Sequence, residues 1–265
     1  MLRTIASLGC FSRDLSSGMS GQLRFTLLAL RAVLDVSKWG RGAAVRVVLD
    51  QTWYTGVGAL SSVSLIALVF GFLVVVQALP AVVDVGAHHW VGTILVLTIV
   101  REFGPLLTGM VVISRSGTAI ASELAVTKIR GEIEVLESMG IDPFHFIVVP
   151  RMIGGAIAVF SLVLYFDVIA LLGGYLVASP RLAITFEAFL GHFIDALSLK
   201  DISLSIIKSV IIGTTIPLIS CYHGLVRMGR ASYEVPQVSR DAVIRCMFFV
   251  FLLSALISGL FYFSG

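Results

Sequence analysis

Five stretches of this 265-residue chain are long, apolar and almost free of charged residues. A helix of about 20 mainly apolar residues crosses the roughly 30 Å hydrocarbon core of a bilayer, and each stretch is long enough to do so. The sequence therefore predicts an all-α integral membrane protein. Its five transmembrane helices are expected at about residues 58–80, 90–114, 152–178, 202–226 and 246–264.

The composition excludes several classes of protein. Hydrophobic residues make up 57% of the chain, charged residues make up 13%, and the mean hydropathy is +1.00. Soluble domains carry roughly 45–50% apolar and about 25% charged residues. A soluble enzyme, a nucleic-acid-binding domain and a disordered chain are therefore excluded. Cys10, Cys221 and Cys246 are too scattered for a disulfide framework or a metal site, and we interpret them as free thiols.

Basic residues are distributed unevenly along the chain. Membrane proteins concentrate Lys and Arg in their short cytoplasmic loops. Of the 19 basic residues, fifteen fall in the N-terminal segment and in the connections that follow the second and fourth spans, with Arg115 counted among them. Two fall in the other connections, at Arg181 and Lys200. The pattern predicts a cytoplasmic N-terminus and a periplasmic C-terminus.

Residues 1–50 are expected to form a cytoplasmic segment before the transmembrane domain at 51–265. Within this segment, residues 21–38 have the pattern of an amphipathic helix. Four charged residues fall within about 60° of one another when successive residues are about 100° apart. They are Arg24, Arg31, Asp35 and Lys38. Such a helix lies in the membrane interface with its basic edge toward the headgroups. The alternative is a helix that packs against the spans.

The second predicted span has charged residues at its centre. Arg101 and Glu102 precede Pro105, which has no amide hydrogen and crowds the Arg101 carbonyl, so we expect a kink here. Ionisable residues at this depth are costly and face protein or a water-filled cavity. Lys208 in the fourth span and Asp167 in the third are the candidate charge partners. The group is either a polar constriction in a transport path or a structural ion pair that locks helices together.

The connection between the second and third spans predicts a short amphipathic helix at about 128–140. Ile129, Ile133 and Leu136 recur at helical spacing among charged residues, and Gly140 is a typical helix end. A helix of this length is not stable alone in water. Its apolar stripe must therefore dock, either onto the spans of this chain or into a groove on a cytoplasmic partner.

The run from Arg101 to Arg151 resembles the signature of the MlaE-type ABC permeases, the lipid-transport family associated with Mla and Mce systems. It reads REFGPLLTGMVVISRSGTAIASELAVTKIRGEIEVLESMGIDPFHFIVVPR. The resemblance is strong over about 90–151 and continues more weakly from the N-terminal helix into the fourth span. The sequence departs from the family at Ser114, where Gly is usual, and at Glu132, where Gln is common.

The resemblance implies the partners of the chain. Such permeases form homodimers, and two cytoplasmic ATPases bind their loop helices. A periplasmic MCE-domain protein forms a ring outside, and a small STAS-domain protein often binds the ATPase. ATP would then be bound by the partner subunit. This fits a chain without a G-x-x-x-x-G-K-[ST] motif, for which we expect no cofactor, no metal and no catalytic residue. The implied location is the bacterial inner membrane.

By position, the resemblance assigns roles to two sets of residues. The substrate cavity and its headgroup contacts are assigned to Arg101, Glu102 and Lys208. Coupling to the ATPase is assigned to Glu123, Lys128, Ile129, Ile133, Leu136, Glu137 and Gly140.

The expected function is movement of phospholipid, or a related lipid, between the inner membrane and the outer envelope. The spans offer few polar groups to a hydrated solute, whereas Arg101 or Lys208 would attract a headgroup phosphate. An alternative is an ion-coupled secondary transporter that uses Arg101, Glu102, Asp167 and Lys208, although five spans without an inverted repeat argue against it. A scaffold that transports nothing would leave these charges without a purpose.

Overall fold

The computed structural model describes residues 21–22, 24–29, 31–32, 41–84, 90–182, 185–227 and 232–264. Within these ranges the chain is helical apart from short turns, and no strand occurs. Five helices are long and apolar enough to cross a membrane. They extend over Val45–Ala78, Gly92–Ile129, Phe144–Arg181, Leu199–Val226 and Val235–Phe263. The prediction of an all-α protein with five spans is confirmed.

Each helix is longer than its predicted span. A count of uncharged residues stops at the first charge, whereas a helix continues into the membrane interface. The second span, expected to end near residue 114, continues to Ile129. Arg115 therefore lies in a helix that continues to Ile129 rather than in an irregular connection. The fifth helix begins at Val235 rather than near residue 246.

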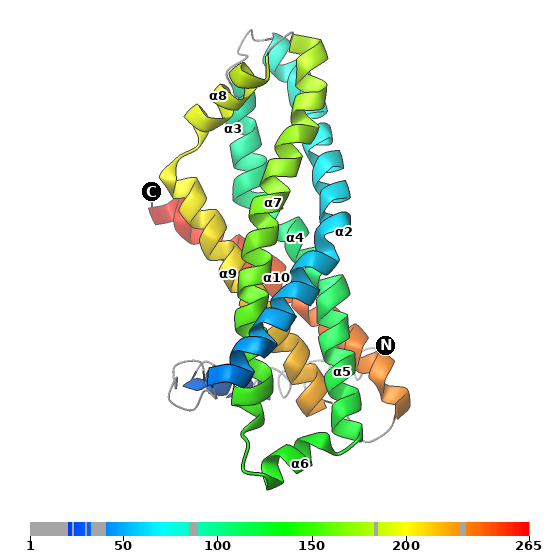
Figure 1. Cartoon of the computed structure of the whole chain (residues 1–265). Coiled ribbons are helices and arrows are strands. Elements are labelled where there is room, and N and C mark those ends of the chain that lie inside the picture. The colour runs from blue at the N-terminus through cyan, green and yellow to red at the C-terminus, as the bar shows by residue number, and fades with distance from the viewer. Residues whose placement is uncertain are drawn as a thin grey trace, which may run out of the picture.

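The helices of the first, third, fourth and fifth spans are regular over most of their length. They are α2 (Arg41–Asp84), α7 (Val149–Leu182) after the π-helical η4 (Phe144–Val148), α9 (Leu199–Tyr222) with its extension η5 (His223–Arg227), and α10 (Val235–Ser264) after η6 (Ser232–Glu234). Two short helices, α6 (Glu132–Ser138) and α8 (Phe186–Ala196), lie at opposite ends of the bundle (Figure 1).

The second span is assembled from five segments. They are α3 (Trp90–Leu95), the π-helical η2 (Val96–Phe103), α4 (Gly104–Val112), the π-helical η3 (Ile113–Gly117) and α5 (Thr118–Ile129). The Gly104 amide donates to the Ile99 carbonyl, five residues back. Pro105 follows and cannot donate to the Arg101 carbonyl. The irregularity predicted at Pro105 therefore takes the form of a widened helix before it, a feature frequent at functional sites.

Glycines bring α2 and α7 into close contact, and the two helices lie side by side (Figure 1). A Cβ atom on Gly71 would lie 1.8 Å from the Ala170 carbonyl oxygen, and one on Gly173 would lie 2.2 Å from the Leu68 carbonyl oxygen. Small residues are typical of helix contacts in lipid, where association depends on close packing.

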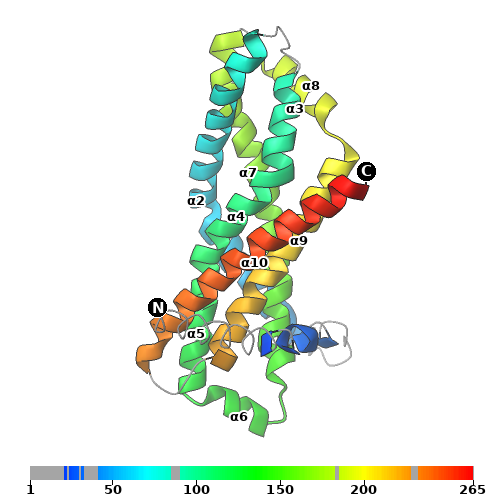
Figure 2. The same cartoon turned by 180° about the vertical axis from the view of Figure 1, so that it is seen from behind.

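The predicted interfacial helix at 21–38 is described only in part, and residues 33–38 lie outside the described ranges. Its described residues are helical and run across the direction of the spans (Figure 2). Phe25 is buried and its ring packs against Tyr222, whereas Leu27 is 60% exposed. One face of this helix therefore packs against the chain. Its position in the membrane interface stays a prediction.

Candidate functional site

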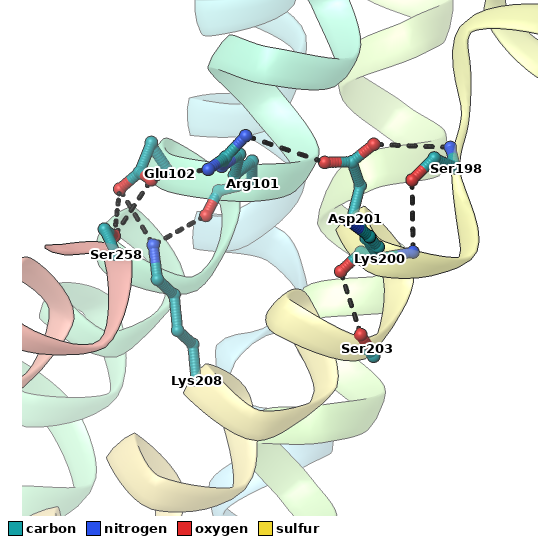
Figure 3. A network of polar contacts seen from close by, with 8 residues as sticks. All are labelled: Arg101, Glu102, Ser198, Lys200, Asp201, Ser203, Lys208 and Ser258. Atoms are coloured by element: carbon teal, nitrogen blue, oxygen red, sulfur yellow. Dashed lines mark hydrogen bonds and ion pairs between the residues drawn. The ribbon is translucent and has the colours of Figure 1, made fainter. Parts of the chain in front are cut away.

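Lys208, on α9, is a fully buried lysine at the centre of a polar cluster inside the membrane (Figure 3). Its ammonium donates to Oε2 of Glu102 at 2.8 Å and to the carbonyl oxygen of Arg101 at 2.8 Å. This is the carbonyl that Pro105 leaves without a helical donor, so Lys208 supplies the missing hydrogen bond. The buried cation thus has an opposite charge and a backbone acceptor beside it, as a buried charge requires.

Glu102 connects three helices. Besides Lys208 on α9, its carboxylate contacts the Ser258 hydroxyl of α10, at 2.9 Å from Oε1 and 3.1 Å from Oε2. Sequence reasoning missed Ser258. A single serine in an apolar span gives no signal beyond the general tendency of hydroxyls to bond between membrane helices.

Arg101 keeps hydrogen-bond donors available. Its guanidinium nitrogens lie 3.9 Å from Oδ1 of Asp201 and 3.9 Å from Oε1 of Glu102, which is beyond hydrogen-bond distance. Asp201 belongs to the capping box at the start of α9, in which its carboxylate accepts from the Ser198 amide (Figure 3). Since the Arg101 side chain is 23% exposed and a guanidinium has five N–H donors, it can hold an anion.

An open hollow of about 440 Å³ borders this cluster. Its lining residues are Leu97, Arg101, Glu102, Ser258, Gly259 and Tyr262. The lining combines the charged Arg101 and Glu102 with the larger, mainly apolar side chains of Leu97 and Tyr262, so it suits an amphiphile whose polar end lies at Arg101. Lys208 has no exposed surface, and in this structure it positions Glu102 and the backbone of Arg101 rather than contacting a ligand.

Asp167, the other candidate charge partner, lies apart from the cluster. It is on α7, is 9% exposed and lies close to Gly104, where an added Cβ would be 2.7 Å from its Oδ1. Among the described residues, Oδ1 has no hydrogen-bond partner. Of the two candidate charge partners, Lys208 therefore joins the cluster, and Asp167 forms no ion pair among the described residues. It joins no metal site either, since the described residues contain no group of three or more His, Cys, Asp or Glu that could hold an ion.

The structure divides the predicted cytoplasmic helix at 128–140. Lys128 and Ile129 are the last residues of α5, and α6 begins only at Glu132. Between them Gly131 has a φ of 73°, a left-handed conformation that suits glycine and interrupts a helix. The prediction of one continuous helix is therefore wrong.

Both ends of the following connection are fixed by hydrogen bonds. At the end of α6, Gly140 has a φ of 76°, and the Ile141 amide donates to the Leu136 carbonyl at 3.0 Å, as in a Schellman motif. Asp142 then accepts a hydrogen bond from the Phe144 amide at 2.9 Å and caps the start of the third span. The loop therefore holds α6 in a defined orientation.

The two faces of α6 have different surroundings. Ile133 and Leu136 are partly buried and pack against a core cluster of this chain. The apolar stripe therefore docks onto the protein's own spans, the first of the two alternatives. Val135 and Met139 are 56% and 68% exposed, and Glu137, on the other side of the helix, is exposed too. Sequence reasoning missed these two apolar residues because they interrupt the charged face.

The remaining predicted coupling residues attach the end of α5 to its neighbours. The Glu123 carboxylate forms an ion pair with Arg151 of α7 at 2.8 Å. The Lys128 ammonium donates to the Leu225 carbonyl of η5 at 2.6 Å. Ile129 packs against a small buried cluster to which α10 contributes. These contacts tie the end of α5 to the third, fourth and fifth spans.

Known proteins similar to this chain include permeases. A family model described as Permease MlaE matches residues 48–260, a range that contains the polar cluster and α6. The chain is 30% identical over 238 residues to a probable ABC transporter permease protein of Rickettsia typhi, and 90% of each chain is covered. It is 26% identical over 218 residues to the intermembrane phospholipid transport system permease protein MlaE of Haemophilus influenzae, with 80% of this chain and 83% of that protein covered. It is also 27% identical over 220 residues to the chloroplastic protein TRIGALACTOSYLDIACYLGLYCEROL 1 of Arabidopsis thaliana, covering 83% of this chain and 62% of that protein.

Proposed function

Because the chain belongs to the MlaE permease family, we propose that it is the membrane subunit of an ABC transporter that moves phospholipid, or a related lipid, between the inner membrane and the outer envelope of a bacterium. The name of the Haemophilus influenzae relative supports phospholipid as the substrate. ATP hydrolysis belongs to a separate cytoplasmic ATPase, so we assign the chain no catalytic residue and no cofactor.

The hollow at Arg101 is the observation that carries this proposal. A headgroup phosphate would accept charge-assisted hydrogen bonds from the guanidinium. The acyl chains would lie against Leu97 and Tyr262, which also line the hollow. A hydrated sugar or amino acid would find too few polar groups here to replace its water.

The proposed assembly follows the family resemblance. Two copies of the chain enclose the lipid, two ATPases bind the loop helices, and a periplasmic MCE-domain ring receives or supplies lipid. A STAS-domain protein is a further partner on the ATPase. We place the N-terminus in the cytoplasm and the C-terminus in the periplasm because basic residues concentrate at the end of the bundle that carries α6.

The proposed coupling begins at α6. Closure of the ATPases on ATP displaces α6, and the contacts of Glu123 and Lys128 pass the displacement into the spans. The second span leads from α5 to η2, where Arg101 and Glu102 lie. Since Lys208 ties η2 to α9, a shift of η2 reshapes the hollow and releases the lipid toward the ring.

The ion-relay alternative gains no support from the contacts. A relay needs ionisable groups that exchange protons or ions along a connected path. Asp167 lies outside the cluster. The Lys208 ammonium is held in place by two acceptors, the Glu102 carboxylate and the Arg101 carbonyl.

Replacing Arg101 with alanine should lower lipid transfer without preventing assembly. A hydrogen bond to a charged group contributes about 1.5–3 kcal/mol, so loss of the guanidinium should slow transfer about tenfold or more. The measurement is transfer of labelled phospholipid between donor and acceptor vesicles by the complete complex in nanodiscs. The control is Arg181→Ala, an exposed arginine at the far end of α7. Equal transfer by the Arg101 variant and the parent would reduce Arg101 to a structural residue and remove the support for the headgroup site.

Replacing Met139 with glutamate should separate the ATPase from the membrane subunit. Met139 is 68% exposed, so its loss leaves the chain's own packing unchanged. In a complex, burial of a methionine side chain contributes about 1.5–3 kcal/mol, and the new charge would add a desolvation cost. We expect at least about a tenfold fall in the ATPase recovered with the tagged permease.

Two variants calibrate this result. Met139→Leu keeps the apolar surface and should retain the ATPase. Leu136→Glu acts on a residue packed against the chain itself and should lower the thermal stability of the permease alone. If the Met139→Glu variant retains the ATPase in full, the ATPase does not bind the exposed face of α6.

A further inference from the structure

Arg115 is an exposed arginine in the long helix that forms the second span. It lies in the π-helical η3, 14 residues before the span ends at Ile129. At 1.5 Å per residue this places its Cα roughly 20 Å along the helix from that end. An arginine at such a position needs protein, water or a lipid headgroup around its guanidinium.

The protein itself satisfies little of this guanidinium. In the described part of the chain, its hydrogen bond is the one from Nη1 to Oγ of Ser62 on α2, at 3.3 Å, and no acidic side chain forms an ion pair with it. The guanidinium also lies close to Gly58 of α2: a Cβ atom added to this glycine would be 3.8 Å from Nη2. An arginine has five N–H donors, so most of them have no acceptor among the described residues.

The neighbouring hydroxyl groups of the same helix already donate their hydrogens to backbone carbonyls, so the guanidinium is the donor left there for an anion. Ser114 donates to the Val111 carbonyl at 2.9 Å, and Thr118 donates to the Ser114 carbonyl at 2.8 Å. Ala119, one turn after Arg115 on the same face, is small and exposed. A headgroup can therefore reach the guanidinium without displacing a side chain.

The depth of Arg115 can be judged from α2. Trp53 and Tyr54 are 66% and 76% exposed, and such aromatic residues mark the membrane interface. Ser62 follows Tyr54 by eight residues, or about 12 Å of helix. The long arginine side chain can extend toward the headgroups from this depth.

We propose that Arg115 and Ser62 bind the phosphate of a phospholipid in the leaflet on the α6 side of the membrane. The planar guanidinium matches a phosphate with two parallel hydrogen bonds, which an ammonium cannot do. This site is separate from the hollow at Arg101, whose lining contains neither residue. It is a point where lipid contacts the protein from the membrane, and its existence does not depend on transport.

The test uses the full chain in nanodiscs with a phosphatidylglycerol that carries a photoreactive headgroup. In the parent we expect cross-links that map to residues 58–62 and 115–119. Arg115→Gln should lower this labelling about tenfold, and Arg115→Lys should lower it less. The matched control is Arg130→Gln, an exposed arginine of the cytoplasmic loop. A diacylglycerol with the same photoreactive group should label the site weakly in every variant, because it has no phosphate.

Each of the following outcomes overturns the proposal. One is equal labelling by Arg115→Gln and the parent. Another is equal labelling of the parent by the diacylglycerol probe. The last is dissociation of the oligomer by Arg115→Gln with unchanged labelling, which would show that a second copy covers the arginine.

If Arg115→Gln fails to fold, the variant Ala119→Leu serves instead, because its larger side chain obstructs the approach of a headgroup and the arginine keeps its charge. Unchanged labelling in that variant also overturns the proposal. Arg101→Ala should retain the labelling at 58–62 and 115–119, so failure at this site is distinguishable from failure of the proposed function.

Discussion

Lys208→Met should destabilise the permease by about 3 kcal/mol, the lower end of the range for removal of one partner of a buried ion pair, because the Glu102 carboxylate is 34% exposed. Methionine fills much of the volume of the lysine stem but has no ammonium. The Glu102 carboxylate would lose its 2.8 Å partner, and the Arg101 carbonyl would lose the donor that replaces the missing Pro105 amide. We expect a large fall in the thermal unfolding temperature of the detergent-purified chain and loss of lipid transfer in nanodiscs.

A double variant isolates the cause. Lys208→Met combined with Glu102→Gln removes both charges and keeps the side-chain volumes, so it should be more stable than Lys208→Met alone. Ser258→Ala removes one hydrogen bond to the same carboxylate and should cost only about 0.5–1.5 kcal/mol. If Lys208→Met unfolds at the parent temperature, or if the two changes are simply additive, the ion pair does not hold these helices together.

The cluster shows how far the sequence could lead. Charges in apolar runs identified Arg101, Glu102 and Lys208, because such residues need partners in lipid. Their pairing depends on the register between η2 and α9, which no local pattern encodes. The sequence therefore offered Asp167 as an equal candidate, and its position beside Gly104 became evident only in the structure. Ser258 was invisible for the same reason.

In the cytoplasmic loop, the periodicity of apolar residues predicted a helix but did not predict its contacts. The spacing of Ile133 and Leu136 indicated a helix with an apolar stripe, and α6 has that stripe. Periodicity could not say what covers the stripe, because that depends on how α6 is placed against distant segments such as the N-terminal helix. The break at Gly131 was also missed, since a glycine inside a helical pattern becomes an interruption only when its φ is positive.

The span bounds and Arg115 show a third limit. The count of uncharged residues ended the second span just before Arg115, although a long side chain can stay in a helix and extend toward the headgroups. The contact with Ser62 on α2 places Arg115 beside the first span. The number of spans was therefore predictable from composition, whereas their bounds required the neighbouring helices.

Gly71→Leu should prevent α2 and α7 from packing. A Cβ at this position would lie 1.8 Å from the Ala170 carbonyl oxygen and 2.6 Å from its carbonyl carbon, and backbone atoms cannot rotate away as a side chain can. Overpacking usually costs about 1–3 kcal/mol, and here the helices must separate, so we expect more than about 3 kcal/mol. In lipid no hydrophobic force restores the contact, because the tails are as apolar as the helices. In size-exclusion chromatography the purified variant should elute as an aggregate. A protease should degrade it faster than the parent.

A graded series gives this prediction its control. Gly71→Ala adds only the clashing Cβ and should already destabilise, with Gly71→Leu more severe. Gly191→Leu makes the same change on α8, where an added Cβ has nothing within 4 Å, and should leave the unfolding temperature close to that of the parent. Normal accumulation and unfolding of Gly71→Leu would mean that α2 and α7 are not in contact at Ala170. The close contact between α2 and α7 would then be absent, and the second span, which packs against both helices through α4, would lose this support.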